Sequence, residues 1–238
     1  MAIKAVVAVQ MIHLGWEATN VPPSGLTDIT FPIAMPKAPH EMDYYFEQAI
    51  AFQHAPENRV IYTGLQPRPN RKGKSIVHAT FSSFFNNTTT EDKHCSYGAD
   101  GGPGVSCHID VEATYNTLYH LRIDRLDHTY NGTLIDAFNA SKSWHIGSFT
   151  LPASVSGMKG YNWVGFMEYF WTNLTYCPKY PYTAATFKPP LTSLPGVRTK
   201  LFPPYRDVHC EGMPWAMKEP VPGTYDITIN PNKAPKST

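Results

Sequence analysis

The sequence predicts an all-β fold, a two-sheet antiparallel β-sandwich of the jelly-roll or concanavalin-like type. About ten short segments alternate apolar and polar residues, and turn residues separate one segment from the next. The 22 prolines and 16 glycines are spread along the chain, so they leave little room for a long helix. We expect one sandwich domain over residues 1–230, with a proline-rich irregular wrap after residue 172, and a flexible tail over residues 231–238.

The first half of the chain contains five predicted strands. In the third of them, Tyr44 and Phe46 lie on one face, whereas Tyr45 and Glu47 lie on the other. This alternation is typical of a strand that separates two environments. The five predicted strands span residues 3–16, 27–34, 42–53, 59–66 and 74–84.

A glycine-dense loop, Ser96–Cys107, follows these strands. Four glycines and one proline occur within residues 98–104, and they permit backbone angles that other residues resist. The loop either lets a ligand approach the backbone closely or is a tight connection without a ligand. It is not a phosphate-binding loop, because no Gly-Lys-Ser/Thr follows it.

The second half of the chain supplies further predicted strands. In the first of these, Tyr119, Leu121 and Ile123 alternate with polar residues, which indicates a sheet with one solvated face. Asn131-Gly132 is the strongest hairpin signal in the sequence, and it predicts a turn between strands 121–130 and 133–138. The first of these strands spans residues 117–126, and the remaining ones span residues 144–151, 161–171 and 223–229.

The charge pattern excludes two classes of partner. The formal net charge is +1 and only 16% of the residues are charged, so there is no clustered basic face for nucleic acid or an anionic membrane. The most basic stretch, residues 68–74, is typical of a solvated loop. No run approaches the roughly 20 apolar residues of a membrane-spanning helix. The sequence does not determine the oligomeric state.

Glycosylation signals predict a secreted, extracellular protein. Chance would supply roughly one or two Asn-x-Ser/Thr acceptor sites. The chain has them at Asn86, Asn87, Asn131, Asn139 and Asn173. Residues 1–9 are too short an apolar stretch for a signal peptide, so we expect the signal peptide of such a protein to be absent from this sequence.

The four cysteines predict two disulfide bonds. We expect Cys95 to pair with Cys107 and Cys177 with Cys210, because each pair brackets a loop and a bridge there restricts the unfolded chain. The alternative is a zinc site built from His94-Cys95 and Cys107-His108. The Cys-x-x-Cys spacing of such sites is absent, which favours the disulfides.

The order of several motifs resembles the uncharacterised secreted domain-of-unknown-function family numbered 3472, over about half of the chain. The resemblance runs through Tyr44-Tyr45-Phe46, residues 62–66, 80–84, 98–102, 119–123 and 143–149, and Phe166–Phe170. It implies a lectin-like β-sandwich and an extracellular location. It implies no established reaction, so the function has to be argued from a site.

Polar residues on predicted strands suggest a carbohydrate-binding surface. His78 lies on one strand, and His120, Arg122 and Asp124 lie on the solvated face of another. With Glu168 they would form a polar surface that contacts sugar hydroxyls, while Trp144 or Trp163 would stack on a sugar ring. The first hypothesis is therefore a secreted, non-enzymatic, lectin-like protein that binds a glycan. The alternative is an ordinary solvated sheet face on which Arg122 and Asp124 merely pair with neighbouring residues.

The second hypothesis is an enzyme. Only Glu47, Asp124 and Glu168 sit on predicted strands where two carboxylates could flank a glycosidic bond. Glu168 is the preferred acid or base, since Phe166 and Phe170 flank it on the same strand face, and His120 is a further catalytic candidate. Such an enzyme would act on a glycan as a hydrolase or lyase, or an aromatic-lined cavity would orient a hydrophobic small-molecule metabolite for cyclisation.

We expect no cofactor, with calcium as the alternative. Asp100 lies among glycines, and Glu91 or Asp92 nearby offers further oxygen ligands. The spacing of an EF-hand loop is absent.

Overall fold

The larger of two β-sheets contains nine strands, and its strand pairs are antiparallel. The computed structural model describes residues 7–56, 59–155, 157–172 and 176–235. The strand order is β13 (Arg198–Leu201), β1 (Val7–Thr19), β11 (Tyr161–Thr172), β3 (Tyr44–Ile50), β4 (Ile61–Arg71), β5 (Lys74–Ser83), β7 (Val105–Glu112) and β6 (Cys95–Tyr97), and β14 (Tyr205–Arg206) also pairs with β1.

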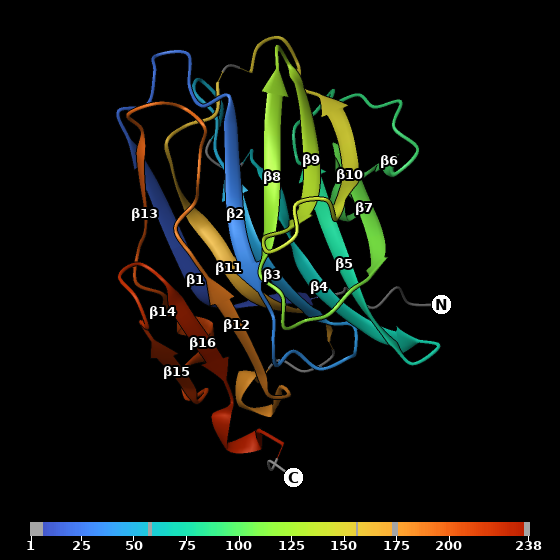
Figure 1. The fold of residues 1–238 in the computed structure, drawn as a ribbon, viewed down its shortest axis with the longest axis vertical. Helices are drawn as coiled ribbons and strands as arrows, with labels where there is room; N and C mark the ends of the chain where they lie inside the picture. The colour runs from blue at the N-terminus through green and yellow to red at the C-terminus, as the bar shows by residue number, and fades with distance from the viewer. Residues whose placement is uncertain (1–6, 57–58, 156, 173–175, 236–238) are drawn as a thin grey trace.

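The smaller sheet contains seven strands, which are also antiparallel. Its order is β10 (Ser143–Thr150), β9 (Thr129–Asp136), β8 (Tyr119–Leu126), β2 (Asp28–Ala34), β12 (Thr183–Phe187), β16 (Tyr225–Ile229) and β15 (Trp215–Lys218). In Figure 1 the strands β2, β8, β9 and β10 overlie strands of the larger sheet. The predicted all-β, two-sheet sandwich is therefore confirmed.

The helical segments in the described part of the chain are 3₁₀ turns of three residues each. None of them is long and apolar enough to span a membrane. They are η1 (Ala99–Gly101), η2 (Cys177–Lys179), η3 (Val208–Cys210) and η4 (Pro231–Lys233).

The hydrophobic core lies between the sheets, and strand alternation decides which residues enter it. On β3, Tyr44 and Phe46 are fully buried in the core, while Tyr45 and Glu47 point to the outer face of the larger sheet. Trp16 is also fully buried, and its indole N–H donates to the Ala49 carbonyl at 2.9 Å. Each buried aromatic side chain of this kind stabilises the fold by about 1.5–3 kcal/mol.

Both predicted disulfide bonds are confirmed. Cys95 is bonded to Cys107 and Cys177 to Cys210, and no described cysteine is free. The predicted alternative of a zinc site with cysteine ligands is therefore wrong, because no thiolate remains to bind the metal. Each bridge closes a loop and destabilises the unfolded chain by about 3 kcal/mol.

The hairpin predicted at Asn131-Gly132 is wrong. Both residues lie inside β9, and the chain turns earlier, between Leu126 and Thr129, where Asp127 has a positive φ of 54°. Gly132 has a packing role instead. A Cβ at this position would lie 2.7 Å from the ring of Phe81, so the glycine lets that ring pack against β9.

The proline-rich part after residue 172 is more regular than expected. It is interrupted by prolines, but β12, β13, β14, β15 and β16 add to one sheet or the other. In the predicted tail, residues 231–233 form η4, and Lys233 Nζ donates to the carbonyls of Pro178 and Tyr180 at 2.8 and 2.9 Å. Residues 236–238 lie outside the described part of the chain.

Candidate active site

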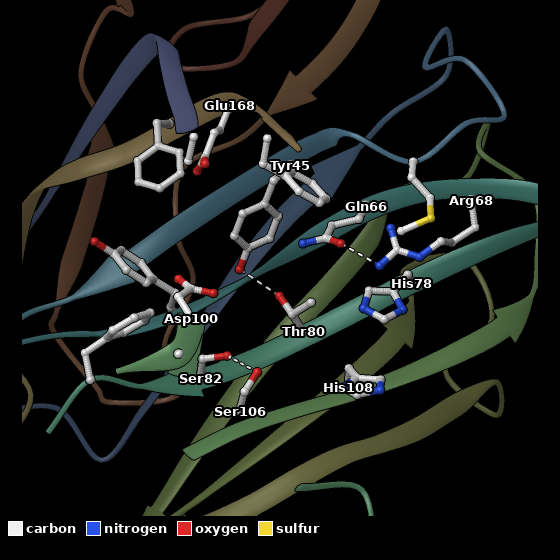
Figure 2. A pocket seen from close by; sticks show the side chains of 17 residues that line it. Tyr45, Gln66, Arg68, His78, Thr80, Ser82, Asp100, Ser106, His108 and Glu168 are labelled. Carbon is white, nitrogen blue, oxygen red and sulfur yellow. Dashed lines mark hydrogen bonds between the residues drawn. The ribbon is translucent and has the colours of Figure 1, made fainter. Parts of the chain in front are cut away.

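A cleft of about 730 Å³ is hollowed into the outer face of the larger sheet. Strands β3, β4, β5, β7 and β11 supply its floor, and the glycine loop supplies Asp100 and Gly101 at its edge. Its volume lies within the range of pockets that bind small organic molecules. Figure 2 shows the side chains that line it.

The lining combines aromatic surface with hydrogen-bonding groups. Its large apolar and aromatic members are Met42, Tyr45, Tyr62, Phe84, Phe166 and Phe170. Its polar members are Gln66, Arg68, His78, Thr80, Ser82, Asp100, Ser106, His108 and Glu168. Such a mixture can hold an apolar ligand and orient its polar atoms.

Glu168 is the best-placed acid in the cleft. The β11 alternation puts it on the same face as Phe166 and Phe170, as the sequence predicted, and only 8% of its surface is exposed. Burial raises the pKa of its carboxyl to about 7, and the negative charge of Asp100 contributes to the shift. Near neutral pH this carboxyl is therefore present in both its protonated and its ionised form.

A second carboxyl, Glu47, lies beside Glu168. Glu47 is opposite Phe166 on the paired strands, and Glu168 is opposite Tyr45, so the two glutamates are diagonal neighbours on one face. Glu47 is completely buried, and burial followed by repulsion from Glu168 raises its pKa well above the usual value. The Phe166 backbone N–H is close enough to favour the ionised form slightly, but no described atom forms a hydrogen bond of normal geometry with either Glu47 oxygen.

Tyr45 crosses the floor of the cleft above a glycine. A Cβ on Gly64 would lie 2.7 Å from Cε2 of Tyr45, so the missing side chain makes room for the tyrosine ring. The Tyr45 hydroxyl then reaches Thr80 Oγ1 at 2.7 Å, and either oxygen can be the donor (Figure 2). This arrangement fixes a phenol group between Glu168 and the opposite wall of the cleft.

Asp100 completes the acidic end of the cleft. It lies in η1 at the tip of the glycine loop, in an exposed turn with a positive φ of 48°. Its carboxyl nevertheless points into the cleft (Figure 2), where partial burial raises its pKa. The predicted glycine loop therefore has a role in shaping the cleft.

Asp92, the other proposed calcium ligand, instead contacts His145 and Ser148, so calcium at Asp100 stays a prediction.

The opposite end of the cleft is basic, as Figure 2 shows. Arg68 Nη2 donates to Gln66 Oε1 at 2.6 Å. His78 Nδ1 is 2.7 Å from Asp110 Oδ1, and its ring stacks on His108. Burial and the charge of Arg68 lower the pKa of His78 to about 4, and Asp110 offsets only part of this shift. At neutral pH, Arg68 therefore supplies a positive charge and His78 a neutral ring.

The structure does not bring the predicted sugar-binding residues together. His120, Arg122 and Asp124 lie on β8, on the outer face of the smaller sheet, whereas His78 and Glu168 lie on the larger sheet. Arg122 forms paired hydrogen bonds with Asp124 at 2.7 and 2.8 Å, which is the alternative that the sequence left open. Burial, and to a smaller extent Lys188, lowers the pKa of His120, but His120 cannot act with Glu168 across the sandwich.

Of the two predicted stacking tryptophans, Trp144 is not part of the cleft lining either. Trp144 lies on β10 of the smaller sheet and packs partly against the core. Trp163 lies on β11, and its side chain is outside the described part of the structure.

Sequence reasoning missed several residues of the cleft. The sequence predicts a solvated loop at Arg68, and it predicts no role for Tyr45 and Gln66. Their strand positions did contain a signal, because residues that alternate with core positions must share the outer face. What the sequence lacked was the strand order, which places β11 next to β3.

No protein-family model matches the sequence, and no curated protein matches it. The resemblance to family 3472 therefore stays a prediction. Among solved structures, the chain is similar to a scytalido-glutamic peptidase with a peptide-based transition-state analogue, at 9% identity over 93% of this chain and 98% of that chain, with a TM-score of 0.45. It is also similar to that peptidase with a transition-state analogue inhibitor, at 10% identity over the same shares and a TM-score of 0.44.

A third similar structure is SCP-B, a member of the eqolisin family of peptidases, in complex with the tripeptide Ala-Ile-His. The identity is 9% over 93% of this chain and 98% of that chain, and the TM-score is 0.40. These three structures are all of peptidases. The prediction of a non-enzymatic, lectin-like carbohydrate-binding protein is wrong, and the residues that it relied on are divided between two sheets.

Proposed function

We propose that this chain is an enzyme in which Glu168 transfers a proton to or from a substrate held in the cleft. The observation that carries this proposal is the position of Glu168. It lies on an aromatic wall of the cleft, next to a second, fully buried carboxyl group on Glu47. Two neighbouring buried carboxyl groups do not stabilise a fold, because each loses its hydration on burial. Acidic side chains that face a cleft and have strongly shifted pKa values are typical of catalytic sites.

The protonation state of Glu168 suits general acid–base catalysis. A group with a pKa of about 7 is available as an acid and as a base at neutral pH. Glu47 is not part of the cleft lining and is completely buried, so we assign it a positioning role. The raised pKa of Glu47 favours its protonated, uncharged form, which limits the negative charge beside Glu168.

The lining favours an uncharged, partly aromatic or apolar substrate. Tyr45, Tyr62 and Phe166 offer ring faces next to Glu168. At the other end, the Arg68 guanidinium favours a carbonyl or other electron-rich oxygen. A short peptide, an aryl glycoside and a polyfunctional small metabolite all have such a combination of groups. For the last of these, the cleft would speed a cyclisation by orientation as well as by proton transfer.

The test is a comparison of turnover between the native chain and Glu168→Gln on these three substrate classes. Glu112→Gln is the matched control, because Glu112 is an exposed glutamate on β7 of the same sheet and pairs with Lys74. We expect turnover of one class by the native chain and the control, and a loss of about 100-fold or more in Glu168→Gln. Unchanged turnover in Glu168→Gln, or none by the native chain in any class, would contradict the proposal.

We further infer that the enzyme works outside the cell as one sandwich domain. Two disulfide bonds are typical of proteins from oxidising compartments. The acceptor residues Asn86, Asn87 and Asn139 are exposed, and Asn131 is partly exposed on β9. Asn173 lies outside the described residues. Expression in a glycosylating host should therefore give a protein whose mass falls after treatment with an N-glycosidase.

A further inference from the structure

Three potential metal ligands meet at the edge of the sandwich, away from the cleft. Asp92 and His94 lie in the segment before β6 of the larger sheet, and His145 lies on β10 of the smaller sheet. One ligand atom from each side chain lies within 4.8 Å of the other two. None of the three residues lines the cleft, so this cluster is independent of the proposed proton transfer.

Two of the three side chains in the cluster contact each other, and the third has a buried ring nitrogen without a hydrogen-bond partner in the described part of the chain. Asp92 Oδ2 is 2.5 Å from His145 Nε2 and accepts a hydrogen bond from Ser148 Oγ at 3.0 Å. The His94 ring is tilted toward that of His145, with 5.8 Å between ring centres. His94 Nδ1 is buried and has no hydrogen-bond partner in the described part of the chain. A buried ring nitrogen without a hydrogen-bond partner destabilises the folded chain, and a bond to a metal ion would offset this cost.

The surrounding backbone holds the cluster in place. The Cys95–Cys107 disulfide directly follows His94, and a Cβ on Gly147 would lie 2.6 Å from Cys95 Sγ. The strand that carries His145 therefore packs tightly against the bridge. Thr90 Oγ1 donates to the Ser148 carbonyl at 2.7 Å, which fixes the loop that carries Asp92. A site that is largely formed before binding needs little ordering when the ion arrives.

We propose that Asp92, His94 and His145 bind a divalent transition-metal ion such as zinc at the junction of the two sheets. Two imidazoles and one carboxylate are the ligand types that zinc and similar ions prefer, and three protein ligands leave a position for water. Calcium and magnesium prefer oxygen ligands, so two histidines among three ligands disfavour these ions. Zinc–ligand distances of about 2.0–2.2 Å in a tetrahedral site place two ligand atoms roughly 3.4 Å apart. Asp92 Oδ2 and His145 Nε2 are 2.5 Å apart, so they have to separate slightly, and the exposed His145 side chain can turn to allow this.

The chain contains a second pair of histidines around one aspartate, which serves as an internal control. Asp207 contacts His13 through Oδ2 at 2.6 Å and His209 through Oδ1 at 2.8 Å. Each histidine thus uses a different carboxylate oxygen, and the three groups are not among the described sets whose ligand atoms all lie within 4.8 Å. The same residue types occur here without the geometry of a shared ion.

The experiment is isothermal titration of the untagged, full chain with zinc chloride, and with calcium chloride in a second series. We expect one zinc ion per chain and no calcium binding at the same concentrations. His145→Ala should weaken zinc binding by at least about ten-fold, because it removes one of three ligands. His94→Ala should do the same, whereas His209→Ala should leave the affinity unchanged.

Thermal unfolding provides a second measurement on the same variants. Zinc should raise the melting temperature of the native chain and of His209→Ala, but not that of His145→Ala, since only an ion bound to the folded state stabilises it. His145 is partly exposed on a strand, so its substitution should not prevent folding. The proposal is overturned if zinc does not bind, if His145→Ala binds it as well as the native chain, or if His209→Ala weakens binding to the same extent.

Discussion

Glu47 and Glu168 are diagonal neighbours across the β3–β11 strand pair, and both carboxyl groups are buried on the face that forms the cleft. Diagonal positions in an antiparallel pair have Cα atoms roughly 7–8 Å apart, which is within reach of two glutamate side chains. Neither acid has a basic partner among the groups that determine its pKa. The pair therefore favours protonated forms, which contributes to the pH dependence of the protein's stability.

Glu168→Gln should change how stability depends on pH. The pKa of Glu168 is raised from 4.5 to about 7 in the folded state, so the folded chain binds more protons than the unfolded chain between these values. Its contribution to stability is therefore present at low pH and is lost as the pH rises through this window. The loss is about 3 kcal/mol, and Glu168→Gln should remove it from the pH profile. Urea unfolding at pH 4.5 and pH 7.5 measures the difference.

His78→Gln should have the opposite effect on the same profile. The pKa of His78 is lowered from 6.5 to about 4, so folding releases a proton in this window. Its contribution to stability is present above pH 6.5 and is lost as the pH falls toward 4. The variant should therefore lose less stability than the native chain on acidification. Equal pH profiles for both proteins would show that His78 is not buried as described.

Tyr45→Phe should test the hydroxyl that crosses the cleft. The change removes the hydrogen bond with Thr80 and leaves the ring over Gly64 in place. We expect a loss of about 1 kcal/mol in unfolding free energy. Tyr97→Phe is the control, because Tyr97 is an exposed tyrosine outside the cleft whose hydroxyl makes only long contacts with Thr90. A loss of stability in the control that matches Tyr45→Phe would contradict a specific role for the Tyr45 hydroxyl.

Gly132→Ala should destabilise the fold through a steric clash. The added Cβ would lie 2.7 Å from the Phe81 ring, which is stacked on Phe149 in the core. Overpacking of this kind costs about 1–3 kcal/mol. Gly102→Ala is the control, since Gly102 has a negative φ of −100° and an added Cβ would meet only the Ala99 carbonyl, at 3.3 Å. Equal stability of the two variants would contradict the close approach of Phe81.

The sequence determined the fold class and most strands, because periodic alternation and turn residues are local signals. It also placed Glu168 between Phe166 and Phe170 correctly, since that statement needs only one strand. It failed for His120, Arg122 and Asp124, because alternation identifies a solvated face without identifying the sheet to which it belongs. The turn predicted at Asn131-Gly132 was wrong for a related reason. Gly132 makes room for the ring of Phe81, which lies 51 positions earlier in the chain.

The cluster of Asp92, His94 and His145 could not be found from the sequence either. Asp92 and His145 are separated by 53 positions, and the packing of the segment around β6 against β10 brings them together. The sequence did single out His94, but with the neighbouring cysteines as its partners. Disulfide formation removed those partners and left the histidine for another role.

The proposed proton transfer requires that Glu168 hold an exchangeable proton near neutral pH. NMR titration of the side-chain carboxyl carbons in glutamate-labelled protein measures this without a substrate. We predict one resonance with a midpoint near pH 7 that is absent from Glu168→Gln and present in Glu112→Gln. If the resonance missing from Glu168→Gln titrates below about pH 5, like an ordinary exposed glutamate, then Glu168 does not transfer a proton in the cleft near neutral pH.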